Sequence, residues 1–216
     1  MTSESRKSGG RRLERREMEA ALRRAHVLDA AAAEFAEKGF DGAQVGAIAA
    51  RAEVSLATVY ALFDSKEILF ESVIEKTAHA IRDTVRSKVE GIPDPRERLL
   101  ALVDALFACF AENQDLLRIY ARGTHGLPWR IRQSMGDRAQ SIFASFAEWV
   151  RSLTTEATAT GSLRGLDADA LALTLIGSVT TAAAAAVEGT TAQSLEVTAG
   201  HVRAVFERLI DAGVAK

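Results

Sequence analysis

Apolar residues recur at helical spacing along most of the chain. Leu28, Ala31, Ala32 and Phe35 follow the i, i+3, i+4, i+7 pattern of one buried helix face, and Gly39 is a good stop for that helix. Strand-like alternation is scarce, and proline occurs only three times. The pattern predicts an all-α protein of about nine helices without a convincing strand.

Capping and breaking residues place the later helices. A fourth helix is expected from about residue 64 to 90, after two short ones. The segment 91–95 breaks the pattern, and Asp94 is placed to cap the next helix with Pro95 at its first position. Further helices are expected over about 129–159, from a cap at Asp167 to about 188, and over about 193–212.

The most informative stretch, residues 43–63, has the pattern of a helix-turn-helix. Val45, Ile48 and Ala49 form the core face of a short helix, and Ala49 is small enough for two helices to cross near a right angle. A tight turn is expected at 52–54. Ser55 is then expected to cap the next helix by accepting from its free backbone N–H groups.

The second helix of this motif is expected to turn an uncharged face outward. Val59, Leu62 and Phe63 point into the core, which leaves four residues on the other side: Ala57, Thr58, Tyr60 and Ala61. Such a face is unusual for solvent and suits the major groove of DNA, where small side chains permit close approach. Leu56 or Ala57 is expected to meet thymine methyls, while Thr58 and Tyr60 donate hydroxyls to phosphate oxygens.

The stretch from Leu28 to Phe70 resembles the DNA-binding domain of the TetR/AcrR family of transcriptional regulators. Five blocks carry the resemblance: Phe35-Ala-Glu-Lys-Gly39-Phe40, Ile48-Ala49, Val54-Ser55, Thr58-Val59-Tyr60-Ala-Leu-Phe63 and Ser65-Lys66-Glu67-Ile-Leu69. The last block is the most diagnostic, because generic helix-turn-helix proteins lack Tyr-x-x-Phe followed by Ser-Lys-Glu. The alternative is a plain helical bundle with a chance similarity.

The resemblance implies specific DNA contacts. It implies that Lys66 contacts a phosphate, that Thr58 and Tyr60 hold the DNA backbone, and that the helix from Ser55 reads bases. The expected DNA-binding residues are Gln44, Ser55, Leu56, Ala57, Thr58, Tyr60 and Lys66.

Four positions depart from the family pattern. Ala43 and Gln44 stand where relatives often carry threonine or serine, so Gln44 would have to supply that phosphate contact. Ala57 replaces a frequent glycine and leaves slightly less clearance. Glu53 also stands where glycine is common, and a non-glycine residue in a left-handed turn costs on the order of 1 kcal/mol.

For residues 71–216 the family matches in helix number and length only. The resemblance implies a ligand cavity within about 94–160 and a dimer interface built by the last two helices. Small residues at 177–186 support the interface independently, because they let another helix approach closely, and several apolar residues of the last helix can partner them: Val197, Val202, Val205, Phe206 and Leu209. The alternative is a helix buried within the monomer.

Aromatic residues gather in the middle helices and are the candidates for ligand binding. The candidates are Phe107, Phe110, Tyr120, Trp129, Phe146 and Trp149. Together they favour a small apolar or aromatic effector over a sugar or a phosphate. The simpler alternative for each ring taken alone is packing in the core.

Charge is distributed unevenly along the 216 residues. The net charge is −2, but residues 1–24 carry eight basic against four acidic side chains, so the remainder is acidic. A basic segment on an acidic body is typical of nucleic-acid binders, although solvated tails are often basic as well. We therefore expect a basic, disordered arm over 1–20, a helix-turn-helix domain over 21–66, and a helical effector-binding and dimerisation domain over 67–216.

Other residues argue against alternative chemistries. Cys109 is the only cysteine and lies in an apolar run, so a buried thiol in a reducing compartment is expected. The four histidines are scattered, and neither a metal site, a cofactor site nor a catalytic constellation is recognisable. No signal peptide is recognisable, and the longest small-apolar run, Ala182–Val187, is too short to span a bilayer.

The sequence thus favours a cytoplasmic, homodimeric, non-enzymatic regulator that binds a palindromic operator in double-stranded DNA and is released as a repressor by a small hydrophobic ligand, without membrane contact. One alternative is an operator-binding regulator without a small-molecule effector. Another is a helical enzyme or scaffold that has co-opted a DNA-binding domain.

Overall fold

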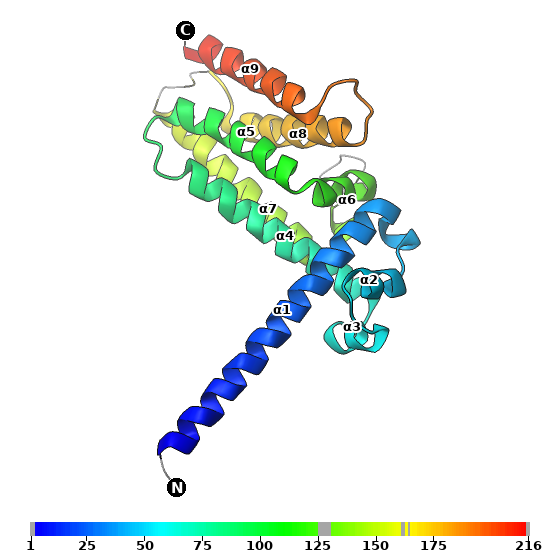
Figure 1. Ribbon diagram of the computed structural model, residues 1–216. Coiled ribbons are helices and arrows are strands. Elements are labelled where there is room, and N and C mark those ends of the chain that lie inside the picture. The colour runs from blue at the N-terminus through cyan, green and yellow to red at the C-terminus, as the bar shows by residue number, and fades with distance from the viewer. Residues whose placement is uncertain (1–2, 125–130, 161–162, 164, 215–216) are drawn as a thin grey trace. The chain divides into compact units, whose positions relative to one another are not determined.

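The computed structural model describes residues 3–124, 131–160, 163 and 165–214, without the side chains of 3–14, 123, 132, 134–135 and 213–214. The expected all-α fold is confirmed: the described residues form nine helices and no strand (Figure 1). The helices are α1 (Ser3–Gly42), α2 (Val45–Arg51), α3 (Leu56–Leu62), α4 (Lys66–Val89), α5 (Pro95–Glu112), α6 (Gln114–Thr124), α7 (Ile131–Ala159), α8 (Ala168–Val187) and α9 (Leu195–Val214).

The chain divides into two compact units, residues 1–73 and 74–216, so that α4 begins in the first and ends in the second. The boundary that we expected after residue 66 lies one to two helical turns earlier. In the first unit, the rings of Phe35, Phe40 and Phe70 pack together, with centroids 5.0 to 6.1 Å apart. Phe35 and Ile48 are fully buried in this core.

The N-terminal segment differs from the disordered arm that we expected. The α1 helix runs from Ser3, and Figure 1 shows its first half extending away from α2 and α3. Residues 11–24 are arginine, leucine, glutamate, methionine and alanine, all good helix formers, and Arg15 pairs with Glu19 one turn later at 3.3 Å. As expected, Gly39 ends the regular helix, because its backbone (φ 70, ψ 174) is accessible almost only to glycine.

The second unit is a bundle in which α5 packs against α6, α7, α8 and α9. Leu99, Leu102 and Val103 of α5 are buried in its centre, together with Leu175 of α8 and Ile210 of α9. Two expected caps are confirmed here, since backbone N–H groups donate to Asp94 at the start of α5 and to Asp167 at the start of α8. The bundle therefore follows the predicted order of helices.

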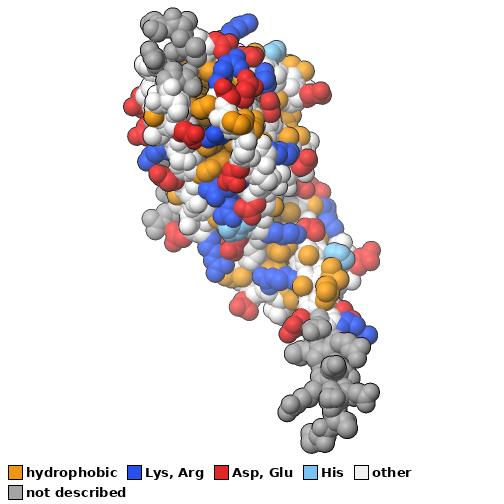
Figure 2. Space-filling view, turned by 90° about the vertical axis from the view of Figure 1, so that its left-hand side faces the viewer, with side chains coloured by type: hydrophobic (Ala, Val, Ile, Leu, Met, Phe, Trp, Pro, Cys, Tyr) orange, Lys and Arg blue, Asp and Glu red, His pale blue; other side chains and the backbone are white. Residues whose placement is uncertain are grey.

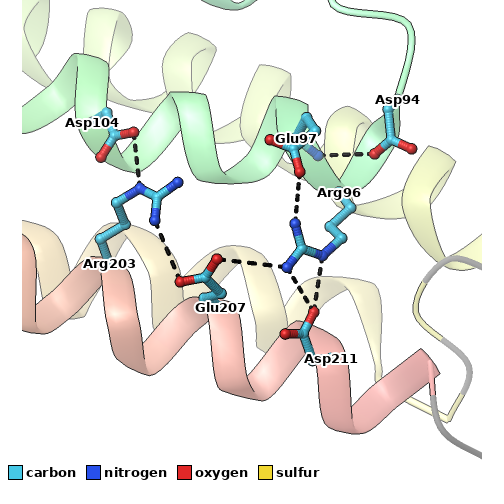
Figure 3. Close-up of polar contacts among 7 residues, drawn as sticks. All are labelled: Asp94, Arg96, Glu97, Asp104, Arg203, Glu207 and Asp211. Carbon is cyan, nitrogen blue, oxygen red and sulfur yellow. Dashed lines mark hydrogen bonds and ion pairs between the residues drawn. The ribbon is translucent and has the colours of Figure 1, made fainter.

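An ionic cluster joins α5 to α9 on the surface of this unit (Figure 3). Arg203 of α9 donates to Asp104 at 3.1 Å, and Arg96 of α5 donates to Asp211 at 2.9 Å. Glu207 lies between them and pairs with both arginines, at 3.4 and 3.7 Å. Single exposed pairs contribute little to stability, but this network fixes which side of α9 faces α5.

The helix α8 is apolar on nearly all sides. Leu171, Leu175 and Val179 face the core, whereas Leu173 is 72% exposed. By length and composition α8 could cross a membrane, and so could α2 and α3 if joined as one bent span, but a core helix passes the same test. The face drawn in Figure 2 shows acidic and basic side chains interspersed, with small hydrophobic groups between them.

Candidate DNA-binding surface and ligand cavity

The helix-turn-helix is built as the sequence predicts. The helices α2 and α3 are bent by 103° relative to each other, and the side chain of Ser55 accepts from the backbone N–H of Thr58 at 3.1 Å. Ala49 is 3% exposed beneath the crossing. Glu53 is the one non-glycine residue with positive φ (55°) among those described, so the expected left-handed turn is present.

Replacing Glu53 by glycine is expected to stabilise the first unit. Glycine adopts this backbone conformation without the clash of a Cβ atom, so the free energy of unfolding in urea should rise by about 1 kcal/mol. The matched control is Ala52→Gly, because Ala52 has φ −82° and gains nothing from glycine. Equal effects of the two substitutions, or a loss in Glu53→Gly, would contradict the expected strain.

The helix α3 has an apolar face that nothing in its own unit covers. Val59 is 1% exposed and Phe63 2%, whereas Leu56 is 47% and Tyr60 48% exposed on the other side. Ala57 and Ala61 lie beside them and are exposed as well. We call Leu56, Ala57, Tyr60 and Ala61 the outward face of α3. It is free of charge and lies opposite the buried side of the helix, which fixes it to the core.

Hydroxyl and amide groups lie at the edge of this face. The hydroxyls of Ser55 and Thr58 are hydrogen-bonded to each other at 2.8 Å, at the start of α3. Gln44 precedes α2 and is exposed, and its side chain forms no cap with that helix. Ser55 and Thr58 therefore lie at the start of the outward face, and Gln44 is turned to solvent before α2.

Lys66 is engaged within its own unit. Its ammonium donates to the carbonyl oxygen of Asp41 at 3.3 Å and lies 4.8 Å from the centre of the Phe40 ring. Lys66 therefore ties the end of α1 to the start of α4. Because an ammonium has three protons, donors remain for a phosphate.

Two side chains that position the motif were missed by the sequence reasoning. Arg24 of α1 donates to the carbonyl oxygen of Leu62 at 2.8 Å, and its guanidinium lies 4.1 Å above the Phe63 ring. Glu34 is 6% exposed and accepts from the backbone N–H of Gln44 at 3.4 Å. Both could have been noticed in the sequence, because each is a charged residue at the helical spacing of the apolar stripe of α1.

Arg51 and Glu37 add a contact between α2 and α1. The guanidinium donates to the carboxylate at 2.9 Å, and this bond lowers the pKa of Glu37 below its ordinary value. Both side chains are exposed, so the pair contributes little to stability. Its effect is to hold α2 in place beside α1.

The second unit contains a cavity of about 140 Å³ whose wall is almost entirely apolar. It is formed by residues of α4, α5, α6, α7 and α8. Among the candidate ligand residues, Phe110, Tyr120 and Phe146 line it. Phe107 is 4% exposed and belongs to the core, and Trp149 packs against Phe146 with ring centroids 5.5 Å apart.

Trp129, the remaining candidate, lies outside the described residues. Cys109 is buried, as expected, and burial raises the pKa of its thiol. Within the described part of the chain, no group of three or more histidine, cysteine or acidic side chains is arranged to hold a metal ion.

Comparison with known proteins agrees with this architecture. Residues 27–73 match the model of the family described as bacterial regulatory proteins, tetR family. The HTH-type transcriptional regulator BetI of Burkholderia cenocepacia is 36% identical over 90 residues, which cover 40% of this chain and 45% of the relative. The HTH-type transcriptional repressor SCO4008 of Streptomyces coelicolor is 33% identical over 96 residues, 44% of this chain and 46% of the relative. The chain thus matches about half the length of these curated relatives.

Solved structures extend the likeness to both units at the level of the fold. A transcriptional regulator from Saccharomonospora viridis in complex with choline has a TM-score of 0.75 at 19% identity, with 87% of this chain and 96% of that chain covered. FadR from Bacillus subtilis in complex with stearoyl-CoA has a TM-score of 0.71 at 20% identity, with 86% and 98% covered. Fold and motif together define a helix-turn-helix regulatory protein. Residues 27–73 have the DNA-binding domain of the tetR family of bacterial regulatory proteins, and the chain is similar to TetR-like regulators in its fold.

Proposed function

We propose that this protein represses transcription by binding a palindromic operator, with the outward face of α3 in the major groove. The observation that carries the proposal is the exposure of Leu56 and Tyr60 on a rigid, uncharged helix face. Leu56 and Ala57 would contact base edges, above all thymine methyls. The phosphate contacts would come from Tyr60 on this face and from four other polar side chains of the first unit: Gln44, Ser55, Thr58 and Lys66.

Footprinting tests this function directly. The purified full-length protein is bound to the DNA that flanks its own gene, in the presence of a large excess of non-specific competitor. We expect protection of one site with twofold sequence symmetry, because two recognition helices of a dimer read two half-sites. Protection that disappears under competition at every position would refute operator binding.

We propose that the operator-binding unit is a homodimer formed by α8 and α9. One stripe on each helix supports this interface: Leu173, Gly177 and Thr181 on α8, and Val197, His201 and Val205 on α9. Leu173, Val197 and Val205 are 72, 47 and 62% exposed. A Cβ atom added at Gly177 would meet nothing within 4 Å, so packing within the chain does not require this glycine.

The structure changes which residues of these helices are available for the interface. Phe206, which we expected to face a partner, is 2% exposed and lies in the core of its own chain. Thr180 and Ala183 of α8 are buried as well. The proposed interface therefore uses the exposed stripes of α8 and α9 named above, and not Phe206, Thr180 or Ala183.

Ligand control is proposed from the cavity and from the course of α4. This helix carries Lys66 beside the helix-turn-helix and Ala78 and Ile81 on the cavity wall. A ligand that binds the DNA-incompetent state more tightly shifts the equilibrium away from the operator. A tenfold loss of operator affinity requires about 1.4 kcal/mol of coupling, within the usual range for allostery.

The alternative of a ligand-independent regulator is favoured by one observation. Drug-sized ligands occupy pockets of roughly 300–1,000 Å³, and the cavity is smaller, at about 140 Å³. A second observation counts against this alternative. A regulator without an effector is expected to have a solidly packed bundle, whereas the second unit contains a cavity. The ligand-responsive proposal therefore requires a compact ligand.

We also propose a cytoplasmic, non-enzymatic protein, as its regulator relatives suggest.

The basic segment is proposed to add electrostatic affinity for DNA. Deleting residues 1–20 removes six arginine or lysine and four glutamate side chains, and it leaves Arg24 in place. We expect the plot of log affinity against log salt to flatten, because fewer counterions are released on binding, while the preference for the operator is kept. Fluorescence anisotropy at several salt concentrations measures both. An unchanged slope would assign the segment no part in DNA binding.

A further inference from the structure

The wall of the cavity offers a ligand no opposite charge. Arg82 of α4 is the one charged residue among its described lining residues, and its guanidinium is held by Asp83 at 2.8 and 2.9 Å. Arg82 therefore lines the cavity with its aliphatic stem. A charged ligand would lose its hydration without gaining a partner, which is strongly unfavourable in an apolar site.

One polar atom of the wall lacks a partner. The hydroxyl of Tyr120 on α6 is buried and forms no hydrogen bond among the described residues. The nearby hydroxyls of Thr124 and Thr180 donate to the carbonyl oxygens of Tyr120 at 2.6 Å and Ile176 at 2.7 Å, and neither hydroxyl oxygen is placed to accept from the phenol. Burial is the largest influence on the pKa of Tyr120 and raises it, so the phenol stays protonated at neutral pH.

A buried donor without an acceptor is unfavourable and rare in folded proteins. At Tyr120 this donor belongs to the wall of an otherwise apolar cavity, and a ligand that brings an acceptor oxygen would satisfy it. The volume limits the size of that ligand. An apolar protein cavity of about 150 Å³ takes up benzene, so about 140 Å³ suits a single substituted ring.

We propose that the effector is a compact, uncharged molecule of about one ring that carries a single acceptor oxygen, and that Tyr120 selects it by donating a hydrogen bond to this oxygen. The inference rests on the proposed ligand-responsive function and names the class of its ligand. A ligand held within this volume has the size of about one ring, and the uncharged wall disfavours permanently charged groups.

A quaternary ammonium ligand is the nearest competitor. Four aromatic residues line the cavity, and such rings attract cations: Phe110, Tyr120, Phe143 and Phe146. One feature opposes this ligand: no carboxylate lies among the described residues of the wall to pair with its charge. Choline is therefore included in the test as the ligand that would overturn the inference.

The test compares two neutral ligands of nearly the same shape, acetophenone with an acceptor oxygen and isopropylbenzene without one. Titration calorimetry gives the affinity of each for the full-length protein and for Tyr120→Phe, which keeps the ring and removes only the hydroxyl. We expect acetophenone to bind about tenfold more weakly to Tyr120→Phe, and isopropylbenzene to bind equally well or better. Comparing each ligand with itself removes their different hydrophobicity from the result.

Ile142→Val is the matched control, because it alters the same wall without removing a polar group. It should change both affinities by the same factor. Thermal melting of both variants confirms that they fold. Equal losses of the two ligands in Tyr120→Phe would overturn the inference, and so would tighter binding of choline or benzoate than of acetophenone.

The same compounds are then added to the footprinted protein–operator complex. Binding that depends on Tyr120 but leaves the complex intact would support the ligand class and refute ligand-induced release. Release by choline that persists in Tyr120→Phe would support the regulatory function and overturn the ligand class. The two hypotheses can therefore fail separately.

Discussion

Val205→Asp is expected to convert the dimer into monomers and, as a consequence, to abolish operator binding. Val205 is 62% exposed in the single chain, so a carboxylate there is hydrated in the monomer. In the dimer this carboxylate would be buried without a partner, and the twofold symmetry would bury one from each subunit. An uncompensated buried charge costs about 3–5 kcal/mol, so the dissociation constant of the dimer should rise at least a hundredfold.

Sedimentation velocity over a range of protein concentrations measures this change. The matched control is Ala80→Asp, an exposed position on α4 away from the stripes of α8 and α9. It introduces the same charge and should leave the dimer intact. Val205→Asp that stays dimeric would place the interface elsewhere on the second unit.

Phe206→Asp separates an effect on the interface from an effect on folding. Phe206 is almost fully buried in the core, so a carboxylate at this position should unfold the second unit and lower the melting temperature steeply. Val205→Asp should leave the melting temperature of the monomer nearly unchanged. Val205→Asp is thus expected to lose dimerisation, whereas Phe206→Asp, at the next residue of the same helix, is expected to lose the folded second unit.

Local rules predicted the helix-turn-helix well. The cap at Ser55, the left-handed turn at Glu53 and the buried pair Val59 and Phe63 each depend on residues within one or two helical turns. Capping and helical spacing are local properties, so a single sequence contains them. The exposure of Leu56 and Tyr60 followed from the same spacing.

The contacts that the sequence reasoning missed join distant positions. Arg24 and Leu62 are 38 residues apart, and no local pattern says that this arginine caps α3. In α9, both Val205 and Phe206 are apolar, and the helix is apolar on much of its circumference. Periodicity could not decide which stripe faces the core, because that depends on the packing against α5 and α8.

Sequence spacing also could not show which aromatic residues of the second unit line the cavity. Phe107 and Phe110 lie one turn apart on α5, yet only Phe110 lines the cavity. Both residues are large and apolar, so their sequence context is nearly identical. The unpartnered hydroxyl of Tyr120 depends on which acceptor oxygens come within its reach, and only the folded chain determines this.

Ala57→Glu is expected to remove operator binding without weakening the fold. Ala57 is exposed in the first turn of α3, where glutamate is a good helix former and interacts favourably with the helix dipole. The urea unfolding curve should therefore stay the same or shift to higher concentration. In the major groove, however, the new carboxylate would face the negative charge of the DNA.

Like charges brought together in an interface cost several kcal/mol, so operator affinity should fall by at least about a hundredfold. Ala57→Ser, which is small and uncharged, should keep most of the affinity, and Ala80→Glu controls for the added charge at a distant exposed site. Fluorescence anisotropy with the footprinted DNA measures all three. Operator binding by Ala57→Glu at the affinity of the parent protein would mean that the outward face of α3 does not enter the groove. The exposed side chains of Leu56 and Tyr60 would then have to serve another partner.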